Sequence, residues 1–212
     1  LVSSSAASDV YKRQLLGLAK LAFIIDTKHK KVIRANLDLS IKDKISPRRY
    51  ESVLRHCHKN LLLVLLQVLR SSRLSIDDLD KSISFENREH VDRALKEGKK
   101  IIFVSAHYGN WELGATALSA LITPTTSIHK KMNNGYFDDY LMKSRTKFKM
   151  TMAEKRGAIK HLLKALKKGE ALSMMVDQNV NPKDGIYIRF LGAKATQTAA
   201  PVSYTHLTLP TT

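Results

Sequence analysis

The chain is poor in residues on which several classes of protein depend. Its 212 residues include a single cysteine, which excludes an internal disulfide framework and fits a reducing compartment. No apolar run reaches the roughly 20 residues that a membrane-spanning helix needs, and the longest is LLLVLLQVL at 61–69. A hydrophobic content of 43% nevertheless indicates a globular chain, long enough for one domain with a core.

Acidic residues are also scarce, since 19 Asp and Glu stand against 36 Lys and Arg and give a formal net charge of +17. So positive a chain favours phosphate-bearing partners, either nucleic acid or an anionic membrane face, although charge also serves simple solubility. Only 7% of the residues are aromatic, which leaves few rings to stack on bases. No nucleic-acid-binding signature is present, so we expect no nucleic-acid partner.

The two ends of the chain differ from the rest. LVSSSAASDVYKRQ and PVSYTHLTLPTT have no helical or strand period that continues their neighbours. We interpret residues 1–14 and 203–212 as translated sequencing-adaptor sequence, with a natural disordered tail as the alternative. Residues 15–202 are then one incomplete domain of a longer gene.

Hydrophobic periodicity predicts a helical lead-in followed by alternating strands and helices. Helices are predicted at 15–39 and at about 47–71, where Ser46 is a plausible N-cap and Pro47 the first helical residue. The further predictions are helices within 87–100 and at 111–122, 135–148 and 156–168, strands at 82–86, 101–106, 125–128, 171–176 and 185–192, and a loop before 82. This alternation indicates an α/β fold with a mostly parallel sheet flanked by helices.

The stretch IIFVSAHYGNWELGA carries the main chemical signal. His107 directly follows a predicted buried strand, and chemistry in open α/β sheets sits at the carboxyl ends of strands. Gly109 suits the turn, and Asn110 suits the cap of a helix whose first turn contains Glu112. We expect the Glu112 carboxylate to return to the His107 imidazole and make it a general base for a hydroxyl. The alternative is a capping glutamate and a histidine satisfied by the backbone.

Basic and amide side chains elsewhere are candidates for binding phosphate. Arg145 lies on a predicted helix, and its planar guanidinium suits bidentate phosphate contact. A solvated basic face is the alternative. Lys131 and Asn133 follow the strand at 125–128, so we expect them at the same rim as His107.

Asp177 and Gln178 follow the strand at 171–176. They could bind acceptor hydroxyls or anchor Arg145, and an Asx turn is the alternative. Thr196 and Thr198 give a weaker signal for substrate contact.

Other kinds of active site find little support. There is no Gly-x-Ser-x-Gly elbow, and Cys57 lies in a predicted helix far from His107, so a covalent acyl-enzyme is not indicated. His56 and His58 flank Cys57 but lack a well-spaced partner pair. We therefore expect neither a metal nor another cofactor.

Two apolar faces admit more than one interpretation. The helix at 156–168 has an apolar stripe and several lysines. It could lie on a membrane surface or dock an acidic carrier protein, besides packing on the core. The run at 61–69 is expected in the core, with an acyl-chain groove as the alternative.

Several ordered blocks of the chain resemble one family. AHYGNWELGA is similar to the His-x₄-Asp/Glu block of the lysophospholipid acyltransferase superfamily, and HYGNWE resembles its lipid A biosynthesis branch, the lauroyl and myristoyl transferases of Gram-negative bacteria. The resemblance covers nearly all of 15–202. It extends to KKVIRANLDLSI, RRYESVLRHCHKN, KKMNNGYFDDYLMKSRTKF, AIKHLLKALKKGEALSMMVDQN and GIYIRFLGAKATQTAAPV.

This resemblance implies an acyltransferase of the bacterial inner membrane, at its anionic cytoplasmic face. It implies transfer of a fatty acyl chain from an acyl carrier protein thioester to a hydroxyl of a phosphorylated lipid A precursor. His107 would be the base and Glu112 its partner. The substrate-binding residues would be Lys131, Asn133, Arg145, Asp177 and Gln178.

Alternatives and departures remain beside this resemblance. A glycerolipid acyltransferase is the nearest alternative, but that group usually carries Asp in the acid position and a later Glu-Gly-Thr block. Coenzyme A as the donor stays open. The family's N-terminal anchor and roughly its last quarter to third are not found in these residues. We expect the 212 residues alone to be poorly soluble and inactive, because lost strands would leave an unpaired sheet edge.

Overall fold

The computed structural model describes residues 17, 21–154 and 157–199. Our interpretation of 1–14 and 203–212 therefore lies outside the described residues. The chain divides into two compact units, which are described separately. One unit contains residues up to Gln67 together with Tyr187–Thr196, and the other contains Val68–Ile186 together with the residues from Gln197 onward.

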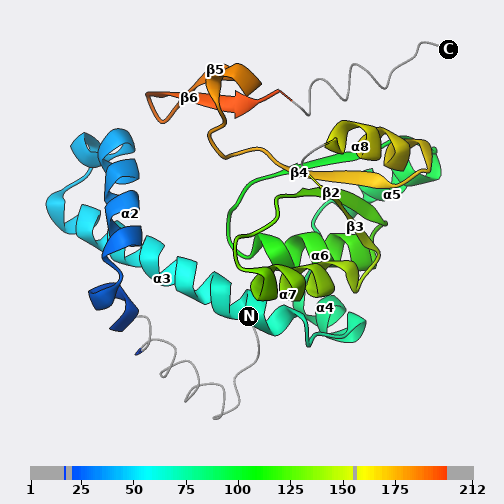
Figure 1. The fold of residues 1–212 in the computed structure, drawn as a ribbon, viewed down its shortest axis with the longest axis horizontal. Coiled ribbons are helices and arrows are strands. Elements are labelled where there is room, and N and C mark those ends of the chain that lie inside the picture. The colour runs from blue at the N-terminus through cyan, green and yellow to red at the C-terminus, as the bar shows by residue number, and fades with distance from the viewer. Residues whose placement is uncertain (1–16, 18–20, 155–156, 200–212) are drawn as a thin grey trace. The chain divides into compact units, whose positions relative to one another are not determined.

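A parallel four-stranded sheet lies at the centre of the second unit (Figure 1). Its strands, in the spatial order β1-β4-β2-β3, are β1 (Ile102–Ser105), β2 (Thr125–His129), β3 (Met150–Glu154) and β4 (Ala171–Met175). All three strand pairings are parallel, so the predicted α/β fold is confirmed. Because β4 lies between β1 and β2, its uncharged sequence is buried, as the lack of charge predicts.

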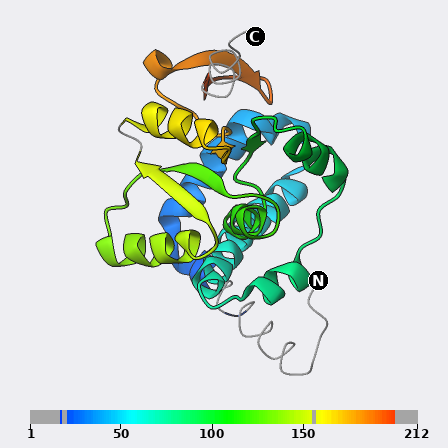
Figure 2. The same cartoon turned by 90° about the vertical axis from the view of Figure 1, so that its right-hand side faces the viewer.

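Helices cover both faces of this sheet. Those that pack on its strands are α6 (Trp111–Leu121), α7 (Gly135–Thr146) and α8 (Ala158–Lys167). Helix α4 (Ile76–Ser82) packs on α6, and α5 (Arg88–Lys96) precedes β1. Figures 1 and 2 show α8 on one face and α6 with α7 on the other. Leu162 and Leu166 of α8 are buried against Leu172 of β4. The apolar stripe of α8 thus packs on the core, and its lysines point to solvent.

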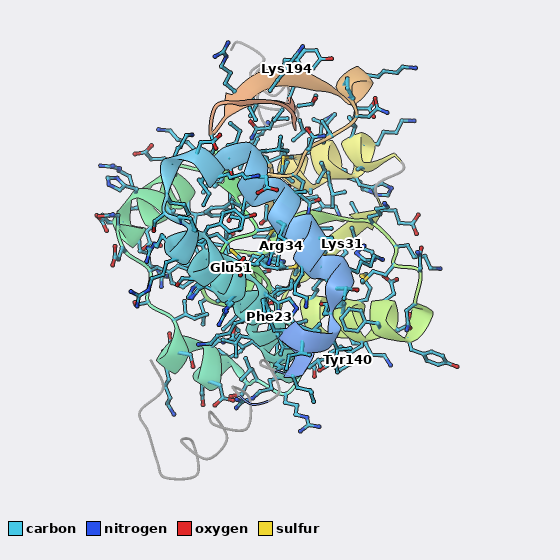
Figure 3. All side chains as sticks on the ribbon, turned by 90° about the vertical axis from the view of Figure 1, so that its left-hand side faces the viewer. Phe23, Lys31, Arg34, Glu51, Tyr140 and Lys194 are labelled. Atoms are coloured by element: carbon cyan, nitrogen blue, oxygen red, sulfur yellow. The ribbon has the colours of Figure 1, made fainter. Side chains whose placement is uncertain are left out.

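The other unit contains the helical lead-in and a small hairpin. Its elements are α2 (Thr27–Ser40), the short helix η1 (Lys42–Lys44), α3 (Pro47–Ser71), β5 (Gly185–Phe190) and β6 (Ala193–Thr198), with α3 and the hairpin strands running past its limits. Helix α3 has the predicted bounds, and Arg49 donates its backbone N–H to the Ser46 hydroxyl. Arg34 of α2 pairs with Glu51 of α3 at 3.0 Å (Figure 3).

Two predictions along the helical part differ from the structure. Asp26 interrupts the helix expected over 15–39, and its side chain caps α2 instead. Residues 15–16 and 18–20 lie outside the described part. In the run at 61–69, Val64 and Val68 are buried, but Leu61, Leu65 and Leu69 are each more than 40% exposed. This run is therefore only partly core in the structure.

The segment before residue 83 was predicted as a loop and is helix α4. Ser75 and Asp78 cap it reciprocally, so that two backbone N–H groups of the first turn find partners. Leu79 is fully buried with Ala117 of α6. The prediction of a strand at 82–86 is wrong. Ile83 packs against this same cluster, and residues 82–86 pair with no other strand.

Two predictions about strands also change. Strand β3 was missed because charged residues flank it, although it is an edge strand with Met150 and Ala153 buried. The segment 185–192 does contain a strand, but β5 pairs with β6 in a separate two-stranded sheet and does not join the main one. Within the described ranges, no helix combines the length and apolar character needed to cross a membrane.

Candidate active site

The site begins with two polar residues in equivalent places on neighbouring strands. Ser105 of β1 is in register with Met175 of β4, and His107 and Asp177 each follow two residues later. Their side chains meet, with His107 Nδ1 2.7 Å from Asp177 Oδ1. The backbone N–H of His107 donates to the other carboxylate oxygen at 2.8 Å. One carboxylate therefore holds both the ring and the backbone of His107.

This contact determines which ring nitrogen of His107 is available. A carboxylate only accepts hydrogen bonds, so Nδ1 carries the proton and Nε2 has a free lone pair. Nε2 faces the amide nitrogen of Gln178 at 3.4 Å, a long contact. The ring packs edge-on against Trp111, with centroids 5.2 Å apart. His107 thus has the tautomer and the open nitrogen of a general base.

The Asp177 carboxyl group is suited to remain charged. Burial raises its pKa, but the hydrogen bonds from the His107 ring and backbone act in the opposite direction and outweigh burial. The net result is a pKa below the ordinary value for aspartate. A charged Asp177 stabilises the imidazolium that forms when His107 takes a proton.

The turn after His107 has the predicted chemistry. Gly109 adopts φ +58°, which is favourable for glycine and strained for most other residues. Asn110 caps α6 by accepting a hydrogen bond from the Leu113 N–H at 3.1 Å. The turn thereby joins the end of β1 to the start of α6 over five residues.

Glu112 does not contact His107, so this part of our expectation is wrong. Its carboxylate pairs with the Arg145 guanidinium of α7, through Arg145 Nε at 2.9 Å and through a second bond from Nη2. The physical reason lies in the helix start: Trp111 takes the place beside the His107 ring. The guanidinium offers Glu112 a stronger, bidentate partner.

Arg145 also differs from the expectation of a phosphate-binding side chain. Glu112 occupies its bidentate edge, and its Nη1 lies 3.0 Å from His129 Nδ1. His129 Nε2 in turn contacts Asp138 Oδ1 at 2.9 Å. The guanidinium of α7 therefore links Glu112 of α6 to His129 of β2, and the Arg145 side chain is mostly buried.

The comparisons with known proteins agree with the resemblance in the sequence. The profile of the bacterial lipid A biosynthesis acyltransferase family matches residues 6–209. The chain belongs to this family. It is 29% identical over 121 residues to the lipid A biosynthesis acyltransferase of Haemophilus influenzae, covering 56% of this chain and 37% of that protein. It is 21% identical over 172 residues to the lipid A biosynthesis lauroyltransferase of Escherichia coli K12, covering 81% of this chain and 55% of that protein.

These matches also limit what family membership establishes. The chain spans about half the length, or less, of these two curated relatives. The matches therefore establish the family to which the chain belongs.

Of the remaining candidate residues, two follow β2 and two lie in the hairpin strand β6. Lys131 and Asn133 are exposed in the loop after β2, whose carboxyl end is at the same edge as that of β1. Thr196 is buried in β6, and Thr198 ends that strand. Neither Lys131 nor Asn133 bonds to His107, whose ring nitrogens face Asp177 and Gln178.

An apolar cavity of about 360 Å³ is lined by residues on either side of His107 in the chain, among them Ser105 and Tyr108. It lies between α6 and the face of β1 and β4, and its lining includes Phe103, Trp111 and Leu118. Trp111 also contacts the His107 ring, so the cavity opens beside the proposed base. Gly114 lines the cavity too, and no atom lies within 4 Å of the place where its Cβ would be.

Within the part of the chain that the structure describes, no arrangement of side chains suits metal-dependent or thiol-based catalysis. No group of three or more His, Cys, Asp or Glu side chains in that part of the chain is placed to hold a metal ion. Cys57 lies in α3, and burial raises the pKa of its thiol, which lowers the fraction of nucleophilic thiolate.

Sequence reasoning missed His129 and Asp138, and it did not pair Asp177 with His107. A signal for Asp177 was present, because it follows β4 by the same two residues as His107 follows β1. His129 ends β2 at the same edge, which is the placement that had singled out His107. Asp138 carried no such signal, because it lies inside α7.

Proposed function

We propose that the protein transfers a fatty acyl chain from an acyl carrier protein thioester to a hydroxyl of a lipid A precursor at the cytoplasmic face of the bacterial inner membrane. The main support for this proposal is the geometry of His107. Its Nδ1 is held by Asp177 at 2.7 Å, while Nε2 stays open near an apolar cavity that Trp111 lines. Family membership supplies the class of reaction.

His107 performs the proton transfers in this proposal. Its Nε2 takes the proton of the acceptor hydroxyl, and the oxygen attacks the carbonyl carbon of the thioester. A C–O bond forms, the C–S bond breaks, and the departing thiolate recovers the proton from His107. Asp177 keeps the ring oriented and stabilises its charged form. The hydroxyl attacks directly, and no acyl-enzyme is required.

Glu112 supports this chemistry indirectly. Its carboxylate is bound by Arg145, and it lies in the first turn of α6, where the helix dipole favours negative charge. The same turn begins with Trp111, the ring that packs on His107. Glu112 is therefore a positioning residue that fixes the start of α6 relative to the base.

The acyl chain of the donor occupies the cavity beside Trp111. The cavity falls within the size range of small-ligand pockets, and its lining is mainly apolar. An alkyl chain there is removed from water while the thioester lies near His107. The phosphates of the acceptor meet exposed basic side chains at the same rim, among them Lys131, with Asn133 and Gln178 available for hydroxyls.

An exposed hairpin supports the membrane-surface part of the proposal. Tyr187, Phe190 and Leu191 are each more than half exposed, and Lys194 Nζ lies 3.9 Å from the Tyr187 ring centroid. Leu191 adopts φ +52°, which strains a bulky side chain and makes its place in an exposed turn costly. Aromatic and aliphatic residues beside cations suit the interface of an anionic bilayer.

The test uses the complete reading frame that contains this chain, expressed in membranes. These are supplied with acyl carrier protein thioester and tetraacylated lipid A precursor, in parallel with coenzyme A thioester and with a lysophospholipid acceptor. We expect acylation of the precursor and a loss of about 10²-fold or more in His107→Ala. His161→Ala, an exposed histidine on α8, is the matched control. The preparation should also sediment with vesicles that contain anionic lipid.

Other outcomes would redirect the proposal. Acylation of the lysophospholipid alone would identify a glycerolipid acyltransferase. Activity that survives His107→Ala would return this histidine to a structural role. Absence of acylation together with salt-sensitive nucleic-acid binding would overturn the proposal.

A further inference from the structure

A second, buried network lies behind the proposed base. Asp138 Oδ1 accepts hydrogen bonds from the Met132 N–H and from the His129 ring, each at 2.9 Å. His129 Nδ1 contacts Arg145 Nη1 at 3.0 Å, and Arg145 binds Glu112. Asp138 and Arg145 are seven residues apart on α7, two helical turns, and so share a face. The network joins the ends of β2, α7 and α6.

The donors and acceptors of this network permit one arrangement of protons. A guanidinium can only donate, so His129 Nδ1 must accept from Arg145. The ring proton is then on Nε2, which donates to Asp138. A doubly protonated ring would present N–H to N–H at Arg145 and break this link. Neutral His129 with the proton on Nε2 is therefore the form that connects Asp138 to Arg145.

Burial makes each link of the network costly to break. The side chains of His129 and Asp138 are less than one-tenth exposed, and those of Arg145 and Glu112 less than one-fifth. The hydrogen bond from the Met132 N–H is the main cause that lowers the pKa of Asp138, with the nearby His129 and Lys131 adding to it against desolvation. A charge left without its partner here would face a weakly solvating interior.

We propose that His129 and Asp138 are positioning residues of the active site, holding Arg145 in the orientation that clamps Glu112 at the start of α6. This inference rests on the proposed acyl transfer. The clamped turn contains Trp111, which packs on His107 and lines the cavity. A shift of this turn would misplace the base relative to the thioester. Displacements of about 1 Å in such positions cost about 10²-fold in rate.

The first test measures kcat and KM in the complete reading frame. His129→Leu removes both hydrogen bonds, and we expect kcat to fall about 10- to 100-fold with little change in KM for the acceptor. His129→Gln keeps an acceptor and a donor and should recover most of this loss. Combining His129→Leu with Glu112→Ala should cost no more than the larger single effect, because both break one network. His161→Leu is the matched surface control.

The second test reads the tautomer of His129 directly and does not need activity. In protein labelled with ¹⁵N-histidine, the signal that His129→Gln removes should report a neutral ring with the proton on Nε2. This result would stand even if no acylation were found, so a failure of the proposed function stays distinguishable. A ring protonated on Nδ1 would overturn the inference. So would parental kcat in a folded His129→Leu variant, or a Gln variant as impaired as the Leu variant.

Discussion

The two histidine–aspartate pairs at the sheet edge have similar bonds and different surroundings. The pairs His107–Asp177 and His129–Asp138 are joined at 2.7 and 2.9 Å. The side chains of the first pair are 30% and 35% exposed, and those of the second 9% and 8%. The ring nitrogen that the aspartate does not bind therefore decides which role such a pair can have. An open nitrogen can exchange a proton with a substrate, whereas one bonded to Arg145 can only hold a position.

The difference arises from which nitrogen each aspartate takes. Asp177 binds Nδ1 of His107 and leaves Nε2, the outer nitrogen, toward Gln178. Asp138 binds Nε2 of His129, so Nδ1 meets the guanidinium. His107 follows β1 by two residues, whereas His129 is the last residue of β2. Helix α7 packs on the neighbouring strand β3 and supplies both Asp138 and Arg145, which separates the roles of the two histidines.

The largest expected effect comes from making the same substitution in both pairs. In Asp177→Asn the amide can donate to His107 Nδ1, which places the ring proton on Nε2, the wrong nitrogen for a base. We expect kcat to fall about 10²- to 10⁴-fold. Asp138→Asn keeps its oxygen as an acceptor for His129 and Met132, so the expected loss is about 10-fold or less. Equal losses in steady-state assays of the two variants would remove the distinction between the pairs.

A smaller effect should come from filling the cavity near the His107–Asp177 pair. Gly114 lies inside α6, where glycine costs about 1 kcal/mol relative to alanine. Its Cβ position is empty, so Gly114→Leu should fill part of the cavity and shift the preference toward shorter acyl donors by about tenfold. Competition between donors of different length measures this. Gly114→Ala should raise stability with a smaller shift, and an unchanged preference in the Leu variant would place the acyl chain elsewhere.

The smallest effect concerns a third pair in the other unit. Asp26 caps α2, accepts from the His29 backbone and contacts His58 of α3 at 3.1 Å. The His29 backbone bond is the largest cause that lowers the pKa of Asp26 from 3.8 to about 2, with burial opposing it. Because the folded pKa is lowered, this carboxylate stabilises the fold above pH 3.8, and the contribution is lost as the pH falls toward about 2.

Urea unfolding measured between about pH 5 and about pH 2 tests this effect, because this range spans the titration of Asp26. In Asp26→Asn, which keeps a capping oxygen, the acid loss of stability should be smaller than in the parent. Acylation at neutral pH should stay unchanged, because this pair belongs to the other compact unit. A parental acid dependence in the variant would assign the effect to other carboxyl groups.

The sequence predicted the frame of the site better than its contacts. Periodicity and capping placed α3, α6 and α8 and the strands β1 and β4 within a few residues, but of the two strands predicted to be buried only β4 is, since Val104 of β1 is more than half exposed. Ser46, Gly109 and Asn110 have the local roles expected of them, because caps and turns depend on near neighbours in the chain. Strand β3 escaped notice, since it is a short edge strand flanked by charged residues and an edge strand need not show a long uncharged run.

The partner of His107 could not be read from the local pattern. Glu112 is five residues away in the chain and Asp177 is seventy, yet Asp177 makes the bond. The deciding quantity is the register of β1 on β4, which brings the ends of the two strands together. Register in a sheet is set by long-range packing of its faces and does not appear in the spacing of one motif.

By itself the sequence determined the class of fold, the family and the turn that presents the proposed base. These follow from hydrophobic period, glycine and cap chemistry, and ordered motifs, all of which act over a few residues. Tertiary structure alone decided which carboxylate holds the proposed base, that Glu112 and Arg145 pair with each other, and which histidine keeps a free ring nitrogen. Hydrogen-bond partners distant in the chain are chosen by strand order and helix packing, and those become definite only when the whole core is assembled.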